Sequence, residues 1–280
     1  SVMLRVVELK ALLRAQGLRL SKRLGQHHLI DAACIERLAA SCGLRPGDTV
    51  IEIGAGLGAL TEPLARRAGW VFAGEVDTRI CALLARRMQG VPNVAVVCQD
   101  ILTFAWDRVP GAVVVGAIPY HITSHILVSL CEHRRFIAAA WLLVQRELAE
   151  RLGASPGTKA YGRLSLLCQY GWQFTQVAAV SRRAFFPQPL VDSAWVRLLP
   201  HKTPAVTVED EPRVFAVVKA AFSHRRKTLA NCLSREGFAT RRQVEECLTK
   251  QGLPPSVRGE VLTFGQFAIL SSALAKAGSW

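Results

Sequence analysis

The first two thirds of the chain alternate between short β-branched runs and longer segments in which apolar residues recur with helical periodicity. Helical segments separate the first four of five strand-like runs, which lie at residues 49–53, 70–75, 94–97, 112–116 and 138–144. Strands that alternate with helices in this way are joined by crossover connections and pair in parallel. The pattern therefore predicts an α/β fold with a doubly wound, Rossmann-like sheet.

Further elements are predicted on both sides of these crossover units. A lead helix is expected over residues 2–16, and Asp31 is placed to N-cap a second helix. Two helices and then two late strands follow the crossover units, at residues 145–152, 160–170, 173–180 and 193–199. We expect the late strands to extend the sheet as an antiparallel hairpin at one edge.

The pattern of hydrophobic and polar residues changes at residues 200–204, a short linker with a proline at each end. Beyond the linker the periodicity is helical only, with segments at 211–223, 226–235, 241–251 and 266–277. A chain of 280 residues is long enough for one large domain and one small one. We therefore predict an α/β domain over residues 1–200 and a small, all-helical domain over residues 201–280.

The net charge and the cysteines indicate which class of partner the protein binds and where in the cell it is found. Lys and Arg outnumber Asp and Glu by 35 to 21, a surplus that favours nucleic acid as the partner over an even solubility charge. No apolar run reaches the ~18 residues of a membrane-spanning helix, so no membrane partner is expected. The eight cysteines form no Cys-x-x-Cys pair, which predicts reduced, mostly buried thiols of a cytoplasmic protein and no metal site.

A glycine-rich turn at residues 50–61 is the strongest local signal of chemistry. A β-branched strand runs into Gly54, Gly56 and Gly58, and a helical segment over residues 59–68 follows. A strand, a turn without Cβ atoms and a helix N-terminus together form a nucleotide-type pocket. The dinucleotide fingerprint has its third glycine three residues after the second, so this spacing and Glu52 favour S-adenosylmethionine instead. The alternative is a tight turn that binds nothing.

Two acidic residues follow neighbouring strands of the predicted sheet. Glu75 ends the second strand, where a carboxylate accepts hydrogen bonds from both hydroxyls of a ribose. Asp100 follows the third strand, where it can accept a bond from an adenine amino group. The alternatives are a helix-capping role for Glu75 and a turn-capping role for Asp100.

The fourth strand ends in Ala117-Ile118-Pro119-Tyr120, at the place where amino-group methyltransferases have Asn or Asp followed by x-Pro-Tyr or x-Pro-Phe. An exocyclic adenine nitrogen is a poor nucleophile because its lone pair is delocalised into the ring. Two acceptors for its N–H groups pull the nitrogen toward a tetrahedral shape, and Tyr120 can stack on the base. Such an enzyme takes the base out of its stack.

With these motifs the chain resembles the small-subunit ribosomal RNA adenine-N6 dimethyltransferases, the family that includes the kasugamycin-sensitivity enzymes. The resemblance runs from about residue 20 to residue 268. Its motifs are residues 24–27, the glycine turn, 75–77, 99–101, 118–120, 145–147, 161–165, 185–187, 191–194 and 225–229. Each motif is weak, but the ordered set is specific. The resemblance implies a class I methyltransferase sheet with a C-terminal helical RNA-binding domain.

The family pattern assigns roles to named positions. It implies S-adenosylmethionine contacts at Gln26, His27, Leu29, Gly54, Gly56, Glu75, Val76, Asp100, Ile101 and Ala117. The target adenine is expected at Ala117, Ile118, Pro119 and Tyr120 and against an aromatic of the pair Phe185 and Phe186. RNA phosphates are expected at Lys22, Arg23, Arg182, Arg183, Arg225, Arg226 and Lys227, for which the alternative is a solvated basic face.

Two positions depart from the family. His28 stands where the family normally has Phe, and Ala117 stands where it has Asn. A methyl group cannot accept the N6 hydrogen bond, which leaves only the Ile118 carbonyl, and one lost preorganised partner costs ~10²–10³ in rate. Three explanations compete: an engineered inactivating substitution, a natural paralogue with weakened catalysis, or another acceptor such as a water near His121.

The expected function is dimethylation of two adjacent adenines near the 3′ end of small-subunit ribosomal RNA, by a monomer acting on an assembling subunit. Two alternatives stay open. One is a non-catalytic ribosome-assembly factor of the same fold, and the other is a large-subunit RNA or DNA adenine methylase.

Overall fold

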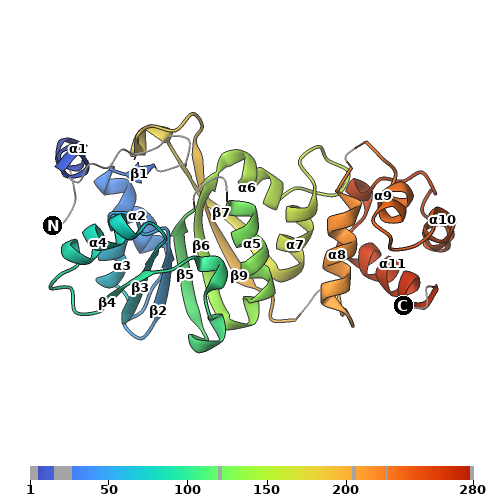
Figure 1. The fold of residues 1–280 in the computed structure, drawn as a ribbon, viewed down its shortest axis with the longest axis horizontal. Helices are drawn as coiled ribbons and strands as arrows, with labels where there is room; N and C mark the ends of the chain where they lie inside the picture. Colours follow the sequence, from blue (N-terminus) through green and yellow to red (C-terminus); the bar gives the residue numbers. More distant parts are fainter. Residues whose placement is uncertain (1–5, 16–26, 119–121, 204–205, 225, 278–280) are drawn as a thin grey trace. The chain divides into compact units, whose positions relative to one another are not determined.

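A computed structural model describes residues 6–15, 27–118, 122–203, 206–224 and 226–277 (Figure 1). The chain forms two compact units. Unit 1 comprises Ser1–Ala149 and Gln173–Pro200, and unit 2 comprises Glu150–Trp172 and His201–Trp280. The chain therefore passes between the units at residue 200, where the linker was expected, and also on both sides of residues 150–172.

Unit 1 is built on a seven-stranded sheet with the order β4-β3-β2-β5-β6-β9-β7. The strands are β2 (Thr49–Ile53), β3 (Trp70–Glu75), β4 (Val94–Cys98), β5 (Ala112–Ala117), β6 (Ile137–Gln145), β7 (Trp172–Val180) and β9 (Ser193–Pro200). The first five pair in parallel, and β9 is antiparallel to β6. The order reverses between β2 and β5, so the doubly wound α/β prediction is confirmed, with the late strands at one edge.

Helices cover this sheet with apolar faces set by their sequence. Those of unit 1 are α1 (Val6–Ala15), α2 (Ala32–Ser41), α3 (Thr61–Ala65), α4 (Thr78–Arg87) and α5 (Thr123–Glu132). Asp31 N-caps α2 as predicted, because its Oδ1 accepts the Cys34 N–H at 2.9 Å. The α2 side chains Ile35 and Leu38 pack in one core with residues of β2, β3, β5, β6 and β9.

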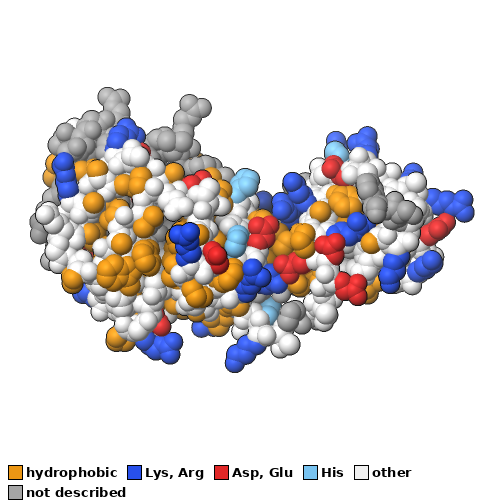
Figure 2. Space-filling model, turned by 60° about the horizontal axis from the view of Figure 1, so that its bottom comes forward, with side chains coloured by type: hydrophobic (Ala, Val, Ile, Leu, Met, Phe, Trp, Pro, Cys, Tyr) orange, Lys and Arg blue, Asp and Glu red, His pale blue; other side chains and the backbone are white. Residues whose placement is uncertain are grey.

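The helix expected between the third and fourth strands is not formed, and that prediction is wrong. Two 3₁₀ turns, η2 (Ile101–Thr103) and η3 (Trp106–Arg108), join β4 to β5 instead. Asp100 starts the first turn by accepting the Leu102 N–H, and Trp106 is 2% exposed, so local bonds and one buried ring fix the connection. Apolar side chains gather on the surface of unit 1 that faces the viewer in Figure 2.

A second, very small sheet was not predicted. Strand β1 (His28–Leu29) pairs antiparallel with β8 (Phe185–Phe186), so that His28 lies opposite Phe186 and Leu29 opposite Phe185. Two-residue strands carry no periodicity, and only the tertiary structure brings these segments together. The helix predicted over residues 59–68 is shorter than expected, because α3 begins at Thr61 and ends at Ala65.

Unit 2 is entirely helical in its described residues outside the start of β7. It contains α7 (Arg163–Gly171), α8 (Glu211–Ala221), α9 (Leu229–Arg235), α10 (Arg241–Lys250) and α11 (Phe264–Ala277), and α6 (Arg146–Leu152) enters it. The Tyr161 hydroxyl donates to the Leu262 carbonyl at 2.9 Å, and the Tyr170 ring stacks on Phe264 at 4.0 Å. These contacts explain why residues 150–172 belong with the C-terminal helices.

The prediction that the cysteines are mostly buried is confirmed. All eight cysteines lie in described residues, seven of them are buried, and Cys98 is exposed. Among the helices that the structure describes, none is both long enough and apolar enough to cross a membrane.

Candidate functional site

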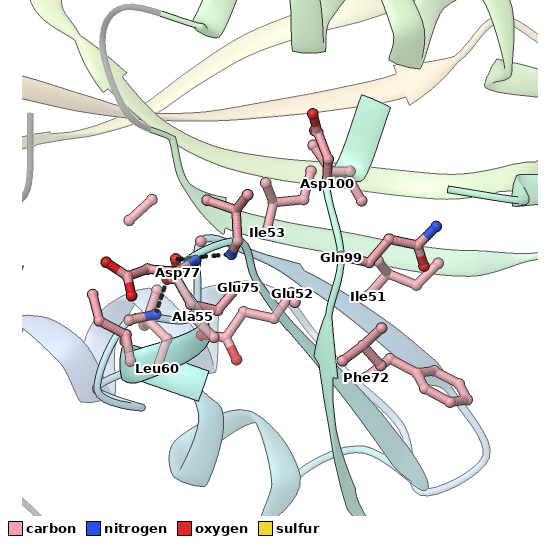
Figure 3. A pocket seen from close by; sticks show the side chains of 18 of the residues that line it. Ile51, Glu52, Ile53, Ala55, Leu60, Phe72, Glu75, Asp77, Gln99 and Asp100 are labelled. Carbon is pink, nitrogen blue, oxygen red and sulfur yellow. Dashed lines mark hydrogen bonds between the residues drawn. The ribbon is translucent and has the colours of Figure 1, made fainter. Parts of the chain in front are cut away.

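A cavity of about 430 Å³ opens at the carboxyl ends of β2, β3, β4 and β5 (Figure 3). It lies at the point where the strand order reverses, which is where open α/β sheets bind ligands. A volume of this size suits a small molecule of nucleoside dimensions. Residues from the glycine turn, from the end of each of the four strands and from the β1 segment line it.

The glycine turn forms one wall of the cavity, and its conformation requires glycine. Gly54, Gly56 and Gly58 have φ angles of 67°, 55° and 86°, in the left-handed region that side chains disfavour. A Cβ on Gly56 would lie 3.2 Å from two ring atoms of His28, and one on Gly58 would lie 2.8 Å from a methyl carbon of Leu84. The turn is therefore closely packed between β1 and α4.

Glu75 holds this turn against the end of β3. One carboxylate oxygen accepts the Gly56 N–H at 3.0 Å, and the other accepts the N–H groups of Val76 and Asp77 at 2.9 and 3.1 Å. The carboxylate thus fixes the glycine turn and the start of α4 at the same time. A carboxylate has about four lone-pair positions, so room remains for one further donor from the cavity.

Glu52 lies beneath the turn and is almost completely buried, with 2% of its surface exposed. The Thr61 hydroxyl donates to its carboxylate at 2.6 Å. Burial raises the pKa of Glu52 from its usual 4.5 to about 7, and the nearby Glu75 carboxylate adds to the increase. Glu52 therefore changes charge near neutral pH at the base of the cavity.

The opposite wall combines one acid with apolar side chains. Asp100 lies across the cavity from Glu75 and Asp77 (Figure 3). Its Oδ1 accepts the Leu102 N–H at 3.0 Å, so the turn-capping bond is present while the residue also lines the cavity. Phe72 and Phe104 add aromatic surface that the sequence did not single out. Such an acid beside flat apolar groups suits a purine ring.

Ala117 lines the cavity at the end of β5, directly opposite Leu143 of β6 in the strand register. Ile118 is 3% exposed and does not line the cavity, and its N–H donates to the Leu143 carbonyl at 3.3 Å. No side-chain acceptor stands at position 117, because alanine ends in a methyl group. Pro119 and Tyr120 lie outside the described residues.

The β1 segment closes the cavity on the side of the glycine turn. Nδ1 of His27 donates to the Pro187 carbonyl at 2.6 Å, since a carbonyl can only accept. The His28 ring packs on Gly56, and burial lowers the pKa of His28 to about 4, with smaller contributions from the charges of His27 and Arg87. His28 is therefore neutral at physiological pH, and its ring packs against the glycine turn at the position where we expected Phe.

The structure brings together nine of the predicted cofactor positions: His27, Leu29, Gly54, Gly56, Glu75, Val76, Asp100, Ile101 and Ala117. The remaining one, Gln26, lies outside the described residues. Phe185 is buried in the core at 5% exposure, and Phe186 packs with Leu9 of α1. Neither aromatic lines the cavity, and the role predicted for the pair stays a prediction.

The predicted RNA contacts fall in different parts of the chain. Arg182 and Arg183 are exposed on the turn before β8, and Arg226 is exposed in unit 2. Lys22, Arg23 and Arg225 lie outside the described residues. Lys227 lines a second cavity of about 280 Å³, within unit 2.

This second cavity is strongly cationic. Five basic side chains and one acid line it: Arg151, Lys159, Arg163, Lys227, Arg258 and Glu260. Four of the five were missed by the sequence analysis because they come from segments far apart along the chain. The signal that could have found Arg163 is its place in the motif at residues 161–165, whose Tyr161 and Ser165 make structural hydrogen bonds.

Comparison with known proteins agrees with this geometry. The family model for ribosomal RNA adenine dimethylase matches residues 17–274. The chain is 40% identical to a ribosomal RNA small subunit methyltransferase A of Geobacillus thermodenitrificans, over 95% of this chain and 94% of the relative. It is 41% identical to the protein of the same name from Moorella thermoacetica, over 94% and 96%.

Two solved structures are similar over most of their length. A dimethyladenosine transferase of Plasmodium falciparum has a TM-score of 0.71 and 25% identity, covering 86% of this chain and 95% of that chain. The 23S rRNA methyltransferase ErmE has a TM-score of 0.62 and 32% identity, covering 88% and 98%.

The raised pKa of Glu52 makes a prediction about stability. Because folding raises this pKa from 4.5 to about 7, the folded protein binds more protons than the unfolded chain between these values. Its contribution to stability is therefore full below pH 4.5 and is lost as the pH rises through 7. Relative to a Glu52→Gln variant, the protein should lose up to about 3 kcal/mol of unfolding free energy between pH 4.5 and pH 8.

Urea unfolding of both proteins at several pH values measures this difference, and groups other than Glu52 cancel in the comparison. A difference between the two proteins that stays constant with pH would show that folding does not raise the pKa of Glu52.

Proposed function

This chain belongs to the ribosomal RNA adenine dimethylase family, and we propose that it transfers methyl groups from S-adenosylmethionine to adenine N6 in small-subunit ribosomal RNA. The observation that carries the proposal is the convergence of Glu75, Asp100 and Ala117, from the ends of three strands, on one cavity closed by the glycine turn. We further propose that the targets are two adjacent adenines near the 3′ end, each methylated twice.

The residues of the cavity fit the proposed cofactor. Glu75 has acceptor capacity for a ribose hydroxyl after its three backbone bonds, and Asp100 can accept from the adenine amino group beside Phe72 and Phe104. Four carboxylates line the cavity, those of Glu52, Glu75, Asp77 and Asp100, and no Lys or Arg is among its described lining residues. Such a lining suits a ligand that carries no pyrophosphate. When bound, S-adenosylmethionine supplies an activated sulfonium methyl group, so that the chemistry requires no metal.

The protein's part in the reaction is to present the target amine correctly. Its two N–H groups need acceptors that turn the nitrogen lone pair out of the ring plane. Ala117 supplies no side-chain acceptor, because alanine ends in a methyl group. We therefore propose that the described residues support cofactor binding and that position 117 limits amine activation.

Small-subunit RNA is favoured as the substrate by the relatives at about 40% identity, whose names specify the small subunit. The cationic cavity of unit 2 supports a polyanionic partner, since five basic side chains and one acid line it. We propose that this cavity and the exposed Arg226 bind RNA phosphates, and that unit 2 positions the substrate.

The alanine at position 117 favours one second candidate function: a ribosome-assembly factor that binds RNA and cofactor and transfers methyl groups slowly or not at all. Tritiated methyl transfer to undermethylated small subunits separates the two candidates when this protein and its Ala117→Asn variant are compared. Parallel assays with free large-subunit RNA and with duplex DNA test whether another adenine substrate is preferred.

Cofactor binding should depend on Glu75. In a Glu75→Ala variant, the ribose loses its acceptor and the Gly56 N–H loses its partner, which should cost about 1–3 kcal/mol of binding free energy. Calorimetry with S-adenosylhomocysteine measures the change. Asp107→Ala, which removes an exposed carboxylate on η3, is the matched control and should bind normally. Unchanged affinity in Glu75→Ala would remove Glu75 from the site.

Methyl transfer should respond strongly to position 117. The Ala117→Asn variant should transfer about two to three decades faster in single-turnover assays on undermethylated small subunits, because it regains one preorganised acceptor. Cofactor and RNA affinity should change little, since the amide acts mainly on the target amine. Equal rates would mean that another group holds the amine.

RNA binding should be steeply salt-dependent through the cationic cavity. Replacing Lys159, Lys227 and Arg258 by Gln should flatten the slope of log affinity against log salt by about 2, because each phosphate contact contributes ~0.7–0.9. Replacing Arg241 and Arg242, which pair with Glu245 and Glu246 on α10, is the control. If both variants keep the original slope, the RNA lies elsewhere.

A further inference from the structure

Two cysteines face each other at the edge of the cofactor cavity. Leu84 and Met88 of α4 pack against Val94 and Val96 of β4. Side chains alternate along a strand, so Cys98 lies on the same face as Val94 and Val96. Helix α4 returns the chain from β3 to the parallel strand β4, so its first turn, which carries Cys81, lies over the carboxyl end of β4.

The contacts at this end confirm the juxtaposition. The Cys81 thiol donates to the main-chain carbonyl of Glu75 at 3.3 Å, and the Gln99 N–H donates to the same oxygen at 3.1 Å. Cys98 lies directly opposite Glu75 in the register of β3 and β4, and the nearby Cys98 thiol adds to the effect of burial in raising the pKa of Cys81. One thiol of the pair is exposed and the other is buried.

We propose that Cys81 and Cys98 form a reversible disulfide that weakens cofactor binding. The oxidant is a low-molecular-weight disulfide such as oxidised glutathione. The exposed Cys98 thiolate attacks one of its sulfurs and releases one glutathione thiol. Cys81 then attacks the Cys98 sulfur of the mixed disulfide and releases the second. Two protein thiols lose two protons and two electrons, and one glutathione disulfide becomes two thiols.

The order of attack follows from the surroundings of the two thiols. Burial raises the pKa of Cys81 to about 12, and the neighbouring Cys98 adds to the increase, so little Cys81 thiolate exists near neutral pH. Cys98 is the accessible thiol of the pair and meets the oxidant first. Once the mixed disulfide has formed, Cys81 is already next to the sulfur that it attacks.

The disulfide would act on the cavity through neighbouring residues. Ile80 precedes Cys81, Gln99 and Asp100 follow Cys98, and all three line the cavity. A disulfide brings the two Cβ atoms to about 3.5–4.5 Å and removes the thiol bond to the Glu75 carbonyl. We expect oxidised protein to bind S-adenosylhomocysteine about tenfold more weakly, and bound ligand to oppose oxidation by the same factor. This effect rests on the proposed cofactor.

The experiment treats the full chain with oxidised glutathione and maps the products by mass spectrometry. Loss of two hydrogen atoms and a crosslinked peptide pair containing residues 81 and 98 are expected. Calorimetry with S-adenosylhomocysteine then compares reduced, oxidised and re-reduced protein. Cys98→Ser should bind normally and lose the oxidation effect, whereas Cys247→Ser, which removes a thiol of unit 2, should keep it.

The possible outcomes distinguish failure of the disulfide proposal from failure of the cofactor proposal. A glutathione adduct on Cys98 without an internal crosslink overturns the disulfide, and so does equal affinity of the crosslinked and reduced proteins. If the reduced protein itself does not bind S-adenosylhomocysteine, the cofactor assignment fails. In that case the crosslink is still decided by mass, and its effect on the cavity edge is read from amide hydrogen exchange at residues 99–103, which should change on oxidation.

Discussion

The carboxylate of Glu75 connects the elements around the cavity. It accepts backbone N–H groups from the glycine turn and from the start of α4, and these segments follow two neighbouring parallel strands. Three charge-assisted hydrogen bonds satisfy donors that strand ends otherwise leave to water. The glycine turn can stay open toward the cavity because the Glu75 side chain, at the end of β3, holds it by a hydrogen bond to Gly56.

Some residues of this cavity differ from those that the family resemblance led us to expect. Its glycine turn and its acidic strand ends carry the motifs expected of the family, whereas positions 28 and 117 depart from the expected residues. Neutral His28 shows that a departure from the family can be absorbed, because its ring packs on Gly56 as an apolar group would. A methyl group in place of an amide is different, since no rearrangement of alanine restores an acceptor.

Local signals made most of the fold predictable. The five parallel strands, the Asp31 cap and the glycine turn each depend on residues close together in sequence, and each is present. The missing helix between β4 and β5 could not be foreseen from periodicity, because the burial of Trp106 is a tertiary effect. The pairing of β1 with β8 and the cationic cavity join distant segments for the same reason. Asp100 shows that a capping role and a place in the cavity do not exclude each other.

The way the chain divides between its units has a consequence for its synthesis. Residues 150–172 leave the ribosome before the strands β7 and β9 that complete the sheet of unit 1, yet their partners in unit 2 come after these strands in the chain. Until the C-terminal helices emerge, the Tyr161 hydroxyl lacks the Leu262 carbonyl and the Tyr170 ring lacks Phe264. Unit 1 can therefore close its sheet once β9 has been made, whereas unit 2 assembles only after the helices that follow residue 200 have been made. A fragment cut at residue 200 would carry an aromatic surface with nothing to cover it.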